Sequence, residues 1–571
     1  MSERRLGVYM CYCGGNISDY VDVERVREVI AREPGVVVAK TALSACSDAT
    51  QQEMVQDIRE HHLDGLVVAS CSPKLHMFTF RGVAKRAGLN PYQYTQVNVR
   101  EQCSWAHTDD REGATRKEIN LIRGAIGKTV LSEPLEPIRI DTVPRVLVVG
   151  AGIAGLRAAL GLADIGLSVL VAEKSDAPGG RVAQLGTMYP HGKNGKQLIK
   201  RLLDEVKNRK NITLYTNAEL VAKSGSIGDF TIKLRVGAEE VTANVGTIII
   251  ATGFDSYLPA VGEYGYGIDG VLTLPEFKER LDSSGGVPTR NGKEIKDVVY
   301  IYCVGSRQDG ERENPNRYCS RYCCNAAVHS SLEVAGRNPK AHQYHLFRDV
   351  RTYGKYELLY TQSREAGATF LRFADDEPPV VEKGAGGKVR VKVKDLLTFG
   401  EEVEIEADAV VLVTGMVPRH SDELVSLLKL PVGRDRFFNE IHPKLRPVET
   451  MVDGVLICGT CQGPKNSSEA VASALAAATQ SAAILKKGYV ELDPLMAWVD
   501  PQRCDGCGEC VASCPYAAIE MAPEGKASVN KAGCKGCGGC VPVCPREAID
   551  LKGYTDAQMK SMIDGFLKEI V

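Results

Sequence analysis

The stretch Arg-Val-Leu-Val-Val-Gly-Ala-Gly-Ile-Ala-Gly at residues 145–155 decides the fold of the central part of the chain. It joins an apolar strand to a turn, Gly150-x-Gly152-x-x-Gly155, and then to an Ala- and Leu-rich helix; Glu173 ends the next expected strand. The glycines permit close approach of a pyrophosphate to a helix N-terminus, and the carboxylate suits a ribose hydroxyl. Because strand, turn, helix, strand and acid lie in register, the stretch predicts a dinucleotide-binding unit, and a merely tight turn is the weaker interpretation.

Three further segments favour FAD as the dinucleotide. Pro178-Gly179-Gly180-Arg181 follows Glu173, and Ile248–Gly253 gives an apolar strand with an Ala-Thr-Gly turn. Residues 454–465 end in Thr-Cys-Gln-Gly-Pro-Lys before an Ala-rich helix, whose N-terminus is expected to face the flavin. Together these segments resemble flavoprotein disulfide reductases and predict a thioredoxin-reductase-like two-domain FAD fold. The candidate FAD-binding residues are Gly150, Gly152, Ala154, Gly155, Glu173, Lys174, Gly180, Arg181, Ala251, Thr252, Gly253, Gly459, Thr460, Gln462 and Lys465.

The second domain of such a fold normally carries its own glycine fingerprint for NAD(P)H, but here a cysteine takes that place. The expected strand at 297–302 is followed by Cys303-Val-Gly-Ser-Arg, which argues against nicotinamide binding. Cys319, Cys323 and Cys324 come shortly afterwards, so four cysteines lie within 22 residues. Four is the number that a 4Fe–4S cluster needs, and a redox dithiol is the alternative interpretation. Further β-strand patterns are expected at 230–236, 241–251, 389–394 and 403–414.

The C-terminal residues carry the most specific pattern in the chain, because one cysteine motif occurs there twice. Each copy has the form Cys-x2-Cys-x2-Cys-x3-Cys-Pro, over residues 504–515 and 534–545. In bacterial two-cluster ferredoxins this spacing lets three thiolates hold one cluster while the fourth crosses to the other. By that rule one set is Cys504, Cys507, Cys510 and Cys544, and the other is Cys534, Cys537, Cys540 and Cys514. A pair of zinc knuckles is the weaker alternative, because zinc sites rarely carry the Cys-Pro ending.

Residues 1–140 are expected to form a small α/β domain, with strands at 6–10, 35–41 and 65–69 and helices at 23–32 and 49–60. Its cysteines lie at or after expected strand ends or in loops, where an α/β sheet presents ligands. They are Cys11, Cys13, Cys46, Cys71 and Cys103. Any one alone could be a structural cysteine. As a set they predict a further cluster, with Cys11 or Cys13 as the spare thiol.

Length and composition bound the remaining choices. At 571 residues the chain is too long for one core, and we expect three domains, at 1–140, 141–490 and 491–571. The 70 basic and 72 acidic residues give no charge excess that favours nucleic acid or an anionic membrane as a partner. Because no apolar stretch is long enough to span a membrane and the start lacks a secretory core, a cytoplasmic location is expected. In that reducing compartment, the 19 cysteines are typical of metal ligands or redox groups.

Taken together, these motifs resemble the HdrA family, the iron–sulfur flavoproteins of heterodisulfide reductase. The resemblance rests on Cys11-x-Cys13-Gly-Gly-Asn-Ile, Ser-Cys71-Ser-Pro, Arg-Glu-Gln-Cys103-Ser-Trp and the segment from Cys303 to Cys324, which are spread over nearly the whole chain. It implies an α/β multidomain protein with an N-terminal cluster domain, the FAD domain and a C-terminal α+β two-cluster ferredoxin domain. It also implies a non-standard 4Fe–4S cluster on Cys303, Cys319, Cys323 and Cys324.

The same resemblance implies an oxidoreductase component that passes electrons between FAD and 4Fe–4S clusters, with flavin-based electron bifurcation as an extension. The partners it implies are heterodisulfide-reductase-like B and C subunits and an electron-input module of hydrogenase, formate dehydrogenase or NADH dehydrogenase type, with a homodimer inside the larger complex. The main alternative is a stand-alone NAD(P)H oxidoreductase with an iron–sulfur tail, similar to glutamate synthase small subunits, and a cluster-based redox sensor is the second. The missing glycine fingerprint counts against the first, and the three FAD segments count against the second.

Two departures from the family pattern matter. Methanogen forms carry a ferredoxin insert after Gly-Gly-Arg, whereas Arg181 leads here to a helix without cysteines, so about four clusters are expected. The family often has a lysine five residues after the paired cysteines, and here that position is His329. A neutral imidazole would stabilise an anionic reduced flavin less than a lysine would, which bears on electron bifurcation. His329 and Lys465 are the residues expected beside the flavin in a catalytic role.

Overall fold

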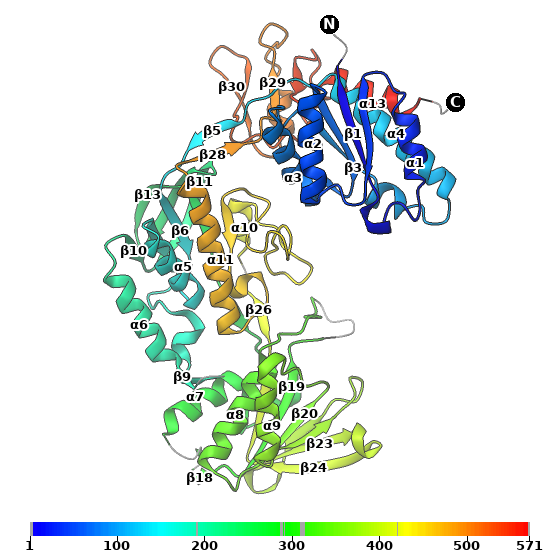
Figure 1. Ribbon diagram of the computed structural model, residues 1–571. Helices are drawn as coiled ribbons and strands as arrows, with labels where there is room; N and C mark the ends of the chain where they lie inside the picture. Colours follow the sequence, from blue (N-terminus) through cyan, green and yellow to red (C-terminus); the bar gives the residue numbers. More distant parts are fainter. Residues whose placement is uncertain are drawn as a thin grey trace. The chain divides into compact units, whose positions relative to one another are not determined.

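The computed structural model describes residues 4–189, 192–285, 289–290, 292–308, 314–419 and 421–568, and Figure 1 labels its helices and strands. The chain divides into two compact units. One unit is Met1–Arg139 together with Glu491–Val571, and the other is Ile140–Val490. The two end regions of the chain therefore belong to one unit, although the sequence predicts them as separate domains.

The N-terminal part of the first unit is built on a parallel sheet with the strand order β2-β1-β3-β4. Its strands are β1 (Leu6–Cys11), β2 (Val36–Ala42), β3 (Gly65–Ser70) and β4 (Tyr94–Asn98), and its helices are α1 (Val23–Ile30), α2 (Asp48–Glu60), α3 (Pro73–Ala87) and α4 (Arg111–Val130). The central strands β1 and β3 are buried along their whole length, as expected for parallel strands covered on both faces. The carboxyl ends of the four strands meet at one edge, which brings the segments after them together.

The C-terminal part of this unit consists of two short antiparallel ribbons and two helices. β29 (Ala497–Val499) pairs with β32 (Ile549–Leu551), and β30 (Ile519–Met521) pairs with β31 (Ala527–Val529). α12 is Glu509–Ser513 and α13 is Asp556–Phe566. Cysteines make up a large share of the small apolar core. A fold with so small a core depends on bound metal for its stability.

Helix α13 packs along α4 at glycines. A Cβ atom added at Gly127 would lie 2.5 Å from the carbonyl oxygen of Ser561, and one added at Gly124 would lie 3.1 Å from that of Met562. The Ser561 hydroxyl donates a hydrogen bond to the carbonyl oxygen of Gly127 at 3.0 Å, across 434 residues of sequence. The missing side chains on α4 therefore let the last helix of the chain close on it.

The second unit contains two halves of similar design. In the first half, a parallel sheet with the order β10-β7-β6-β14-β27 packs helices on one face and a three-stranded antiparallel sheet on the other. The parallel strands are β6 (Arg145–Val149), β7 (Ser168–Ala172), β10 (Ile212–Tyr215), β14 (Thr247–Ile250) and β27 (Val455–Ile457). The helices are α5 (Ile153–Asp164), α6 (Gly195–Lys207) and α11 (Ser467–Leu485), and the antiparallel strands are β11 (Ala218–Ser226), β12 (Asp229–Val236) and β13 (Glu239–Val245).

The second half repeats this arrangement on a parallel sheet with the order β16-β25-β19-β20-β21. These strands are β16 (Val271–Thr273), β19 (Asp297–Val304), β20 (His342–Phe347), β21 (Thr369–Arg372) and β25 (Ala409–Thr414). One face packs against α7 (Leu274–Ser284) and α8 (Cys323–Arg337), with α9 (Glu357–Glu365) beside α8. The other face packs against the antiparallel strands β22 (Val380–Lys383), β23 (Val389–Asp395) and β24 (Glu401–Ala407). β15 (Phe254–Ser256) pairs with β26 (Met416–Pro418) where the chain crosses between the halves.

Two of the expected β-runs each form two strands in different sheets. The run at 241–251 forms β13 and β14, and the run at 403–414 forms β24 and β25. In the first run the chain turns the corner at Gly246, where an added Cβ would lie 2.5 Å from the carbonyl oxygen of Val143. A side chain there would push the two sheets apart. The apolar pattern continues through the corner because both strands are buried on the faces that meet.

Helix α5 depends on the absence of a side chain at Gly155, because a Cβ there would collide with the carbonyl oxygen of Gly150. We expect Gly155→Ala to destabilise the flavin half by about 1–3 kcal/mol, since backbone has to shift. Gly161→Ala in the same helix is the matched control. Its Cβ would meet the movable Leu475 side chain at 3.3 Å, and a change under about 1 kcal/mol is expected. Thermal unfolding followed by circular dichroism measures both, and equal midpoints would contradict the expectation.

Candidate functional site

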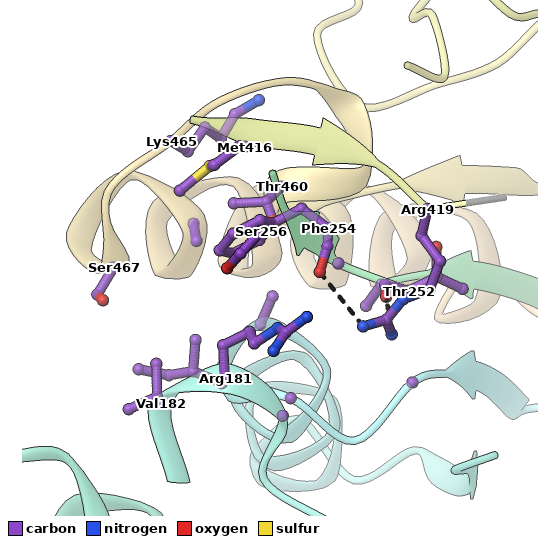
Figure 2. Close-up of a pocket in the computed structure, with 18 of the residues that line it drawn as sticks. Arg181, Val182, Thr252, Phe254, Ser256, Met416, Arg419, Thr460, Lys465 and Ser467 are labelled. Carbon is purple, nitrogen blue, oxygen red and sulfur yellow. Dashed lines mark hydrogen bonds between the residues drawn. The ribbon is translucent and has the colours of Figure 1, made fainter. Parts of the chain in front are cut away.

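The largest feature of the second unit is a cavity of about 640 Å³ at the carboxyl ends of β6 and β14 (Figure 2). Its walls come from the glycine-rich turn, from the N-terminal end of α11, and from α7 and α8 of the second half. Open α/β sheets bind ligands at this position, outside the carboxyl ends of the strands. The volume lies within the range of cofactor sites.

The glycine-rich turn forms a wall of backbone atoms. Gly150 has φ +105°, and a Cβ there would lie 2.5 Å from the carbonyl oxygen of Ala251. Gly152 precedes α5 and faces Gly180, whose added Cβ would lie 3.1 Å from the Gly152 Cα. The N–H groups at the start of α5 are therefore open to an anionic ligand. Gly155 lies beneath the turn and Ala154 beside it, where Gly459 packs with a built Cβ 2.8 Å from the Ala154 Cβ.

Glu173 closes one end of the cavity. One of its carboxylate oxygens accepts a hydrogen bond from the Ala151 N–H at 2.7 Å, and the other accepts from the Ser175 N–H at 3.1 Å and hydroxyl at 2.9 Å. This holds the carboxylate at the turn, as the ribose contact of a dinucleotide requires. Lys174 also lines this end, with an exposed side chain that forms an ion pair with Glu219 at 3.0 Å.

Arg181 supplies the strongest indication of a negatively charged ligand. Its Nη2 contacts Asp255 at 3.1 Å, but its Nε is buried, lines the cavity region and has no hydrogen-bond partner in the described part of the chain. Arg419 lies across from it and donates to the carbonyl oxygens of Thr252 at 2.9 Å and Phe254 at 3.2 Å (Figure 2). A buried N–H without a partner is costly, and a phosphate oxygen would satisfy it. The glycine wall and this guanidinium therefore fit FAD.

The start of α11 lines another part of the cavity with Thr460, Lys465 and Ser467 (Figure 2). Asn466 caps the helix, and its partner Glu469 completes a capping box. Burial lowers the pKa of Lys465, while Cys461, Glu440 and Glu469 act in the opposite direction. The helix N-terminus and this lysine together favour negative charge on a bound ring. Gln462 does not line the cavity, because its amide donates to Glu440 at 2.8 Å and to the Pro447 carbonyl oxygen at 2.6 Å.

Helix α8 lines the wall that the second half contributes. Tyr322, Ala326, His329 and Ser330 recur on one face of it and all line the cavity. The His329 ring lies 6.3 Å from that of Tyr189, centroid to centroid, and Tyr189 packs edge-on against Tyr356 at 5.6 Å. The turn Ala251-Thr252-Gly253 lines the cavity as well. His329 and Lys465 thus both lie on the cavity wall.

The same helix begins at two of the four clustered cysteines. Cys323 and Cys324 are buried and hydrogen-bonded to each other, which raises the pKa of Cys323 and lowers that of Cys324. Cys303 and Cys319 lie close enough to Cys323 to interact with it electrostatically. Cys303 stands at a bulge of β19 with φ +63°, a strained conformation for a residue other than glycine. The structure therefore brings all four thiols together.

Guanidinium groups surround these thiols. Burial raises the pKa of Cys303, whereas Arg348 and Arg307 oppose the rise. Arg351 faces Cys324 and acts in the direction of thiolate. Since a cluster ligand is a thiolate, a cationic surrounding favours cluster ligation by this set over a neutral dithiol.

In the N-terminal part, four of the five predicted cysteines lie together at the carboxyl edge of the sheet. Burial raises the pKa of Cys11, and the neighbouring Cys13 and Cys46 add to the rise. Burial likewise raises the pKa of Cys71 to about 11, with Arg100 opposing it and Cys13 and Cys11 contributing. Arg100 also donates to the Cys13 sulfur at 3.4 Å.

Cys103 lies apart from this group. Its thiol donates to the Ala114 carbonyl oxygen at 3.1 Å, and its pKa, raised to about 12 by burial and then by Glu118, includes no contribution from another cysteine. The sequence places the spare thiol at Cys11 or Cys13, whereas in the structure Cys103 is the separate one. The π-helical turn at Arg100–Ser104 directs its side chain toward α4.

The cysteines of the C-terminal part fall into the two crossed sets. Burial raises the pKa of Cys510, and Cys507, Cys504 and Cys544 add to it. Burial also raises the pKa of Cys540 to about 11, with contributions from Cys534, Cys537 and Cys514. Backbone N–H groups donate to the sulfurs of Cys514, Cys544 and Cys534 at 3.3–3.4 Å. Such bonds stabilise cluster thiolates.

Sequence reasoning misses several residues of the cavity wall. Arg419 follows the second Val-Thr-Gly turn, and Tyr189 follows the Gly-Gly-Arg segment, but neither belongs to a motif. Lys278 could have been found from periodicity, because it lies on the same face of α7 as the buried Leu274 and Leu281. A lysine on a buried helix face needs a partner, which is a signal in itself.

Comparison with protein families identifies two regions of the chain. Residues 144–295 match the family described as pyridine nucleotide-disulphide oxidoreductase, and residues 497–551 match the 4Fe-4S dicluster domain. With the sheet topology, these matches confirm the predicted flavoprotein fold, the C-terminal ferredoxin domain, and FAD and 4Fe–4S clusters as cofactors. In the described part of the chain, no helix has both the length and the hydropathy needed to cross a membrane.

Solved and curated proteins resemble the chain at different ranges. A thioredoxin reductase from T. acidophilum aligns with 60% of this chain and 99% of its own, at 20% identity and a TM-score of 0.41. An HdrA protein of the CoB–CoM heterodisulfide reductase of Methanopyrus kandleri is 37% identical and covers 91% of each chain. The HdrA protein of the H(2):CoB-CoM heterodisulfide,ferredoxin reductase of Methanothermobacter thermautotrophicus is 36% identical over 100% of this chain and 98% of its own.

The second of these HdrA alignments runs over 655 positions, more than the 571 residues of this chain, so that relative has segments that are missing here. This agrees with the predicted short form. At these identities over nearly the full length, the chain belongs to the HdrA family of CoB–CoM heterodisulfide reductase, as its motifs predict.

Proposed function

We propose that this chain passes electrons between FAD in the large cavity and 4Fe–4S clusters within a heterodisulfide-reductase-like complex. The observation that carries the proposal is the position of α8. Its first residues, Cys323 and Cys324, belong to the four-cysteine group, and the next turns place Ala326 and His329 on the cavity wall. Groups fixed to one helical turn stay within a short distance of each other, since an α-helix rises 1.5 Å per residue.

The residues around the cavity hold and orient the dinucleotide. The glycine turn and Arg181 bind the pyrophosphate, Glu173 binds the ribose, and the start of α11 with Lys465 favours negative charge on the ring. FAD supplies two-electron chemistry that is linked to one-electron carriers such as 4Fe–4S clusters. Tyr322 lies between the two sites, with its hydroxyl donating to the Thr414 carbonyl oxygen at 3.2 Å.

Four cluster sites are proposed on the described cysteines. One is Cys303, Cys319, Cys323 and Cys324; the second is Cys11, Cys13, Cys46 and Cys71; the third is Cys504, Cys507, Cys510 and Cys544; and the fourth is Cys534, Cys537, Cys540 and Cys514. The thiol interactions described above support each set. Cys103 is proposed to be structural.

The second half of the flavin unit argues against NAD(P)H as a direct donor. Where a nicotinamide site has its glycine turn, β19 ends in the bulge at Cys303. Donors therefore reach the chain through protein partners, by way of the clusters. The printed names of relatives mention H(2), formate and ferredoxin, which supports an electron-input module and B and C subunits as partners. A homodimer, electron bifurcation and a cytoplasmic location stay predictions.

The flavin-side cluster is tested by Cys323→Ser. We expect anaerobically purified wild type to contain about sixteen irons and one FAD per chain, from four clusters of four irons each. The variant should lose about four irons and keep its FAD, because cluster and dinucleotide use different segments. Cys458→Ala, at a buried cysteine outside the four sets, is the control and should keep all its iron. Unchanged iron in Cys323→Ser, with loss of a two-electron thiol titration, would replace the cluster by a dithiol.

The N-terminal ligand set is tested by a second pair of variants. Cys46→Ser should lower the iron content by about four atoms per chain, because one ligand of a four-iron cluster is removed. Cys103→Ser should keep the iron content of wild type, since its thiol bonds to the Ala114 carbonyl oxygen instead of facing the other cysteines. The reverse result, with iron lost only in Cys103→Ser, would refute the proposed set.

A further inference from the structure

Helix α7 brings a lysine to the wall of the flavin cavity. Lys278 lines the cavity, and its side chain is only 10% exposed. It follows the buried Phe277 on a helix that packs against α8. Burying a lysine is unfavourable unless the ammonium group has partners. The partners therefore show what this position requires.

Two carboxylates hold the Lys278 ammonium. Its Nζ contacts Asp282 at 3.0 Å within α7, and it also forms an ion pair with Glu333 of α8. The Glu333 carboxylate in turn lies 3.8 Å from the Nδ1 of His329. The side chains of Asp282, Glu333 and His329 are 8%, 12% and 14% exposed. The four side chains form one buried set, of which Lys278 and His329 line the cavity.

The charges in this set do not balance while His329 is neutral. Two carboxylates and one ammonium carry a net charge of −1, and one proton on His329 brings the sum to zero. Excess charge in a buried set is unfavourable, and a second negative charge nearby increases the cost. A set with one missing proton therefore responds to the charge of the ligand beside it.

The groups that face His329 oppose each other. Burial lowers its pKa below 6.5, as does Lys278, whereas Glu333 and Asp282 raise it. Tyr189 also packs against the ring, and burial raises the pKa of its hydroxyl, so this group stays neutral. His329 is therefore mostly neutral near pH 7 while the ligand carries no extra charge.

We propose that Lys278, Asp282, Glu333 and His329 form a charge-balancing set on the wall of the flavin site, in which Lys278 presents a cation to the cavity and His329 binds one proton when the flavin gains negative charge. This inference rests on the proposed function, because it needs FAD in the cavity. The two electrons come from the reductant through the clusters. Besides the proton that the flavin itself takes up, one proton from solvent forms an N–H bond on His329, and reoxidation releases it.

The sign of the pH effect follows from this scheme. Negative charge on the flavin raises the proton affinity of His329, so the extra proton is taken up between the pKa of the oxidised state, below 6.5, and that of the reduced state. Within this window the two-electron potential falls as pH rises, more steeply than the flavin alone requires. One additional proton per two electrons makes the couple change tenfold per pH unit, which is about 30 mV.

The experiment is a redox titration of the flavin in the full chain between about pH 5 and 8.5, a window around the ordinary histidine pKa. We expect the extra slope in wild type and its loss in His329→Gln. Lys278→Met should lower the potential, because the carboxylates then face the flavin unopposed, and should move the extra slope to higher pH. Lys278→Arg keeps the charge and should behave as wild type, and Lys340→Met, at an exposed lysine after α8, is the control.

Each outcome is decisive. Equal slopes in wild type and His329→Gln, or equal potentials in Lys278→Met and Lys340→Met, would overturn the inference. If Lys278→Met loses its FAD, the comparison of wild type with His329→Gln decides alone, and a pH-indicator dye can count the protons taken up on reduction. FAD content is measured first, because a wild-type chain that binds no FAD would contradict the proposed function and not this inference.

Discussion

The first turn of α8 is the constraint on which the rest of the flavin unit depends. Its residues have two roles, because Cys323 and Cys324 point to the other cysteines while Ala326 and His329 face the cavity. A helix is rigid over such a distance, so neither site can move without the other. The left-handed Cys303 at the end of β19 meets the same turn from the sheet. The strain at this residue is tolerated because the surrounding structure fixes the position of its thiol.

The two sites also differ in what they are made of. Backbone N–H groups and carbonyl oxygens form the wall around the glycine turn, whereas thiols and guanidinium groups form the surroundings of the cluster. Backbone dipoles suit a ligand that is recognised by shape and phosphate charge. Arginines beside thiolates reduce the net negative charge of a cluster and thus affect its reduction potential. Charge on the flavin side is instead adjusted by α7 and α8.

The sequence predicts the parts of the site that follow from local spacing. The glycine turn, Glu173 and the crossed cysteine sets all depend on neighbours within one motif, and the strands of the N-terminal sheet lie within a few residues of the predicted ranges. Placement across elements could not be predicted in the same way. Cys103 has the spacing of a ligand, but a π-helical turn directs its thiol to α4. Gln462 belongs to the motif but bonds to Glu440, and Lys278 belongs to none, because its role depends on which helix packs beside α7.

The closure of α13 on α4 has a consequence for the order in which the protein is made. Gly127 on α4 bonds to Ser561, which is synthesised 434 residues later. Domains usually fold as units while the ribosome is still translating, beginning at the N-terminus. Here the flavin unit lies between the two parts of the first unit in the sequence and can fold as soon as its own residues have emerged. The unit that is started first is therefore completed last, and α4 keeps an uncovered, glycine-lined face through most of translation.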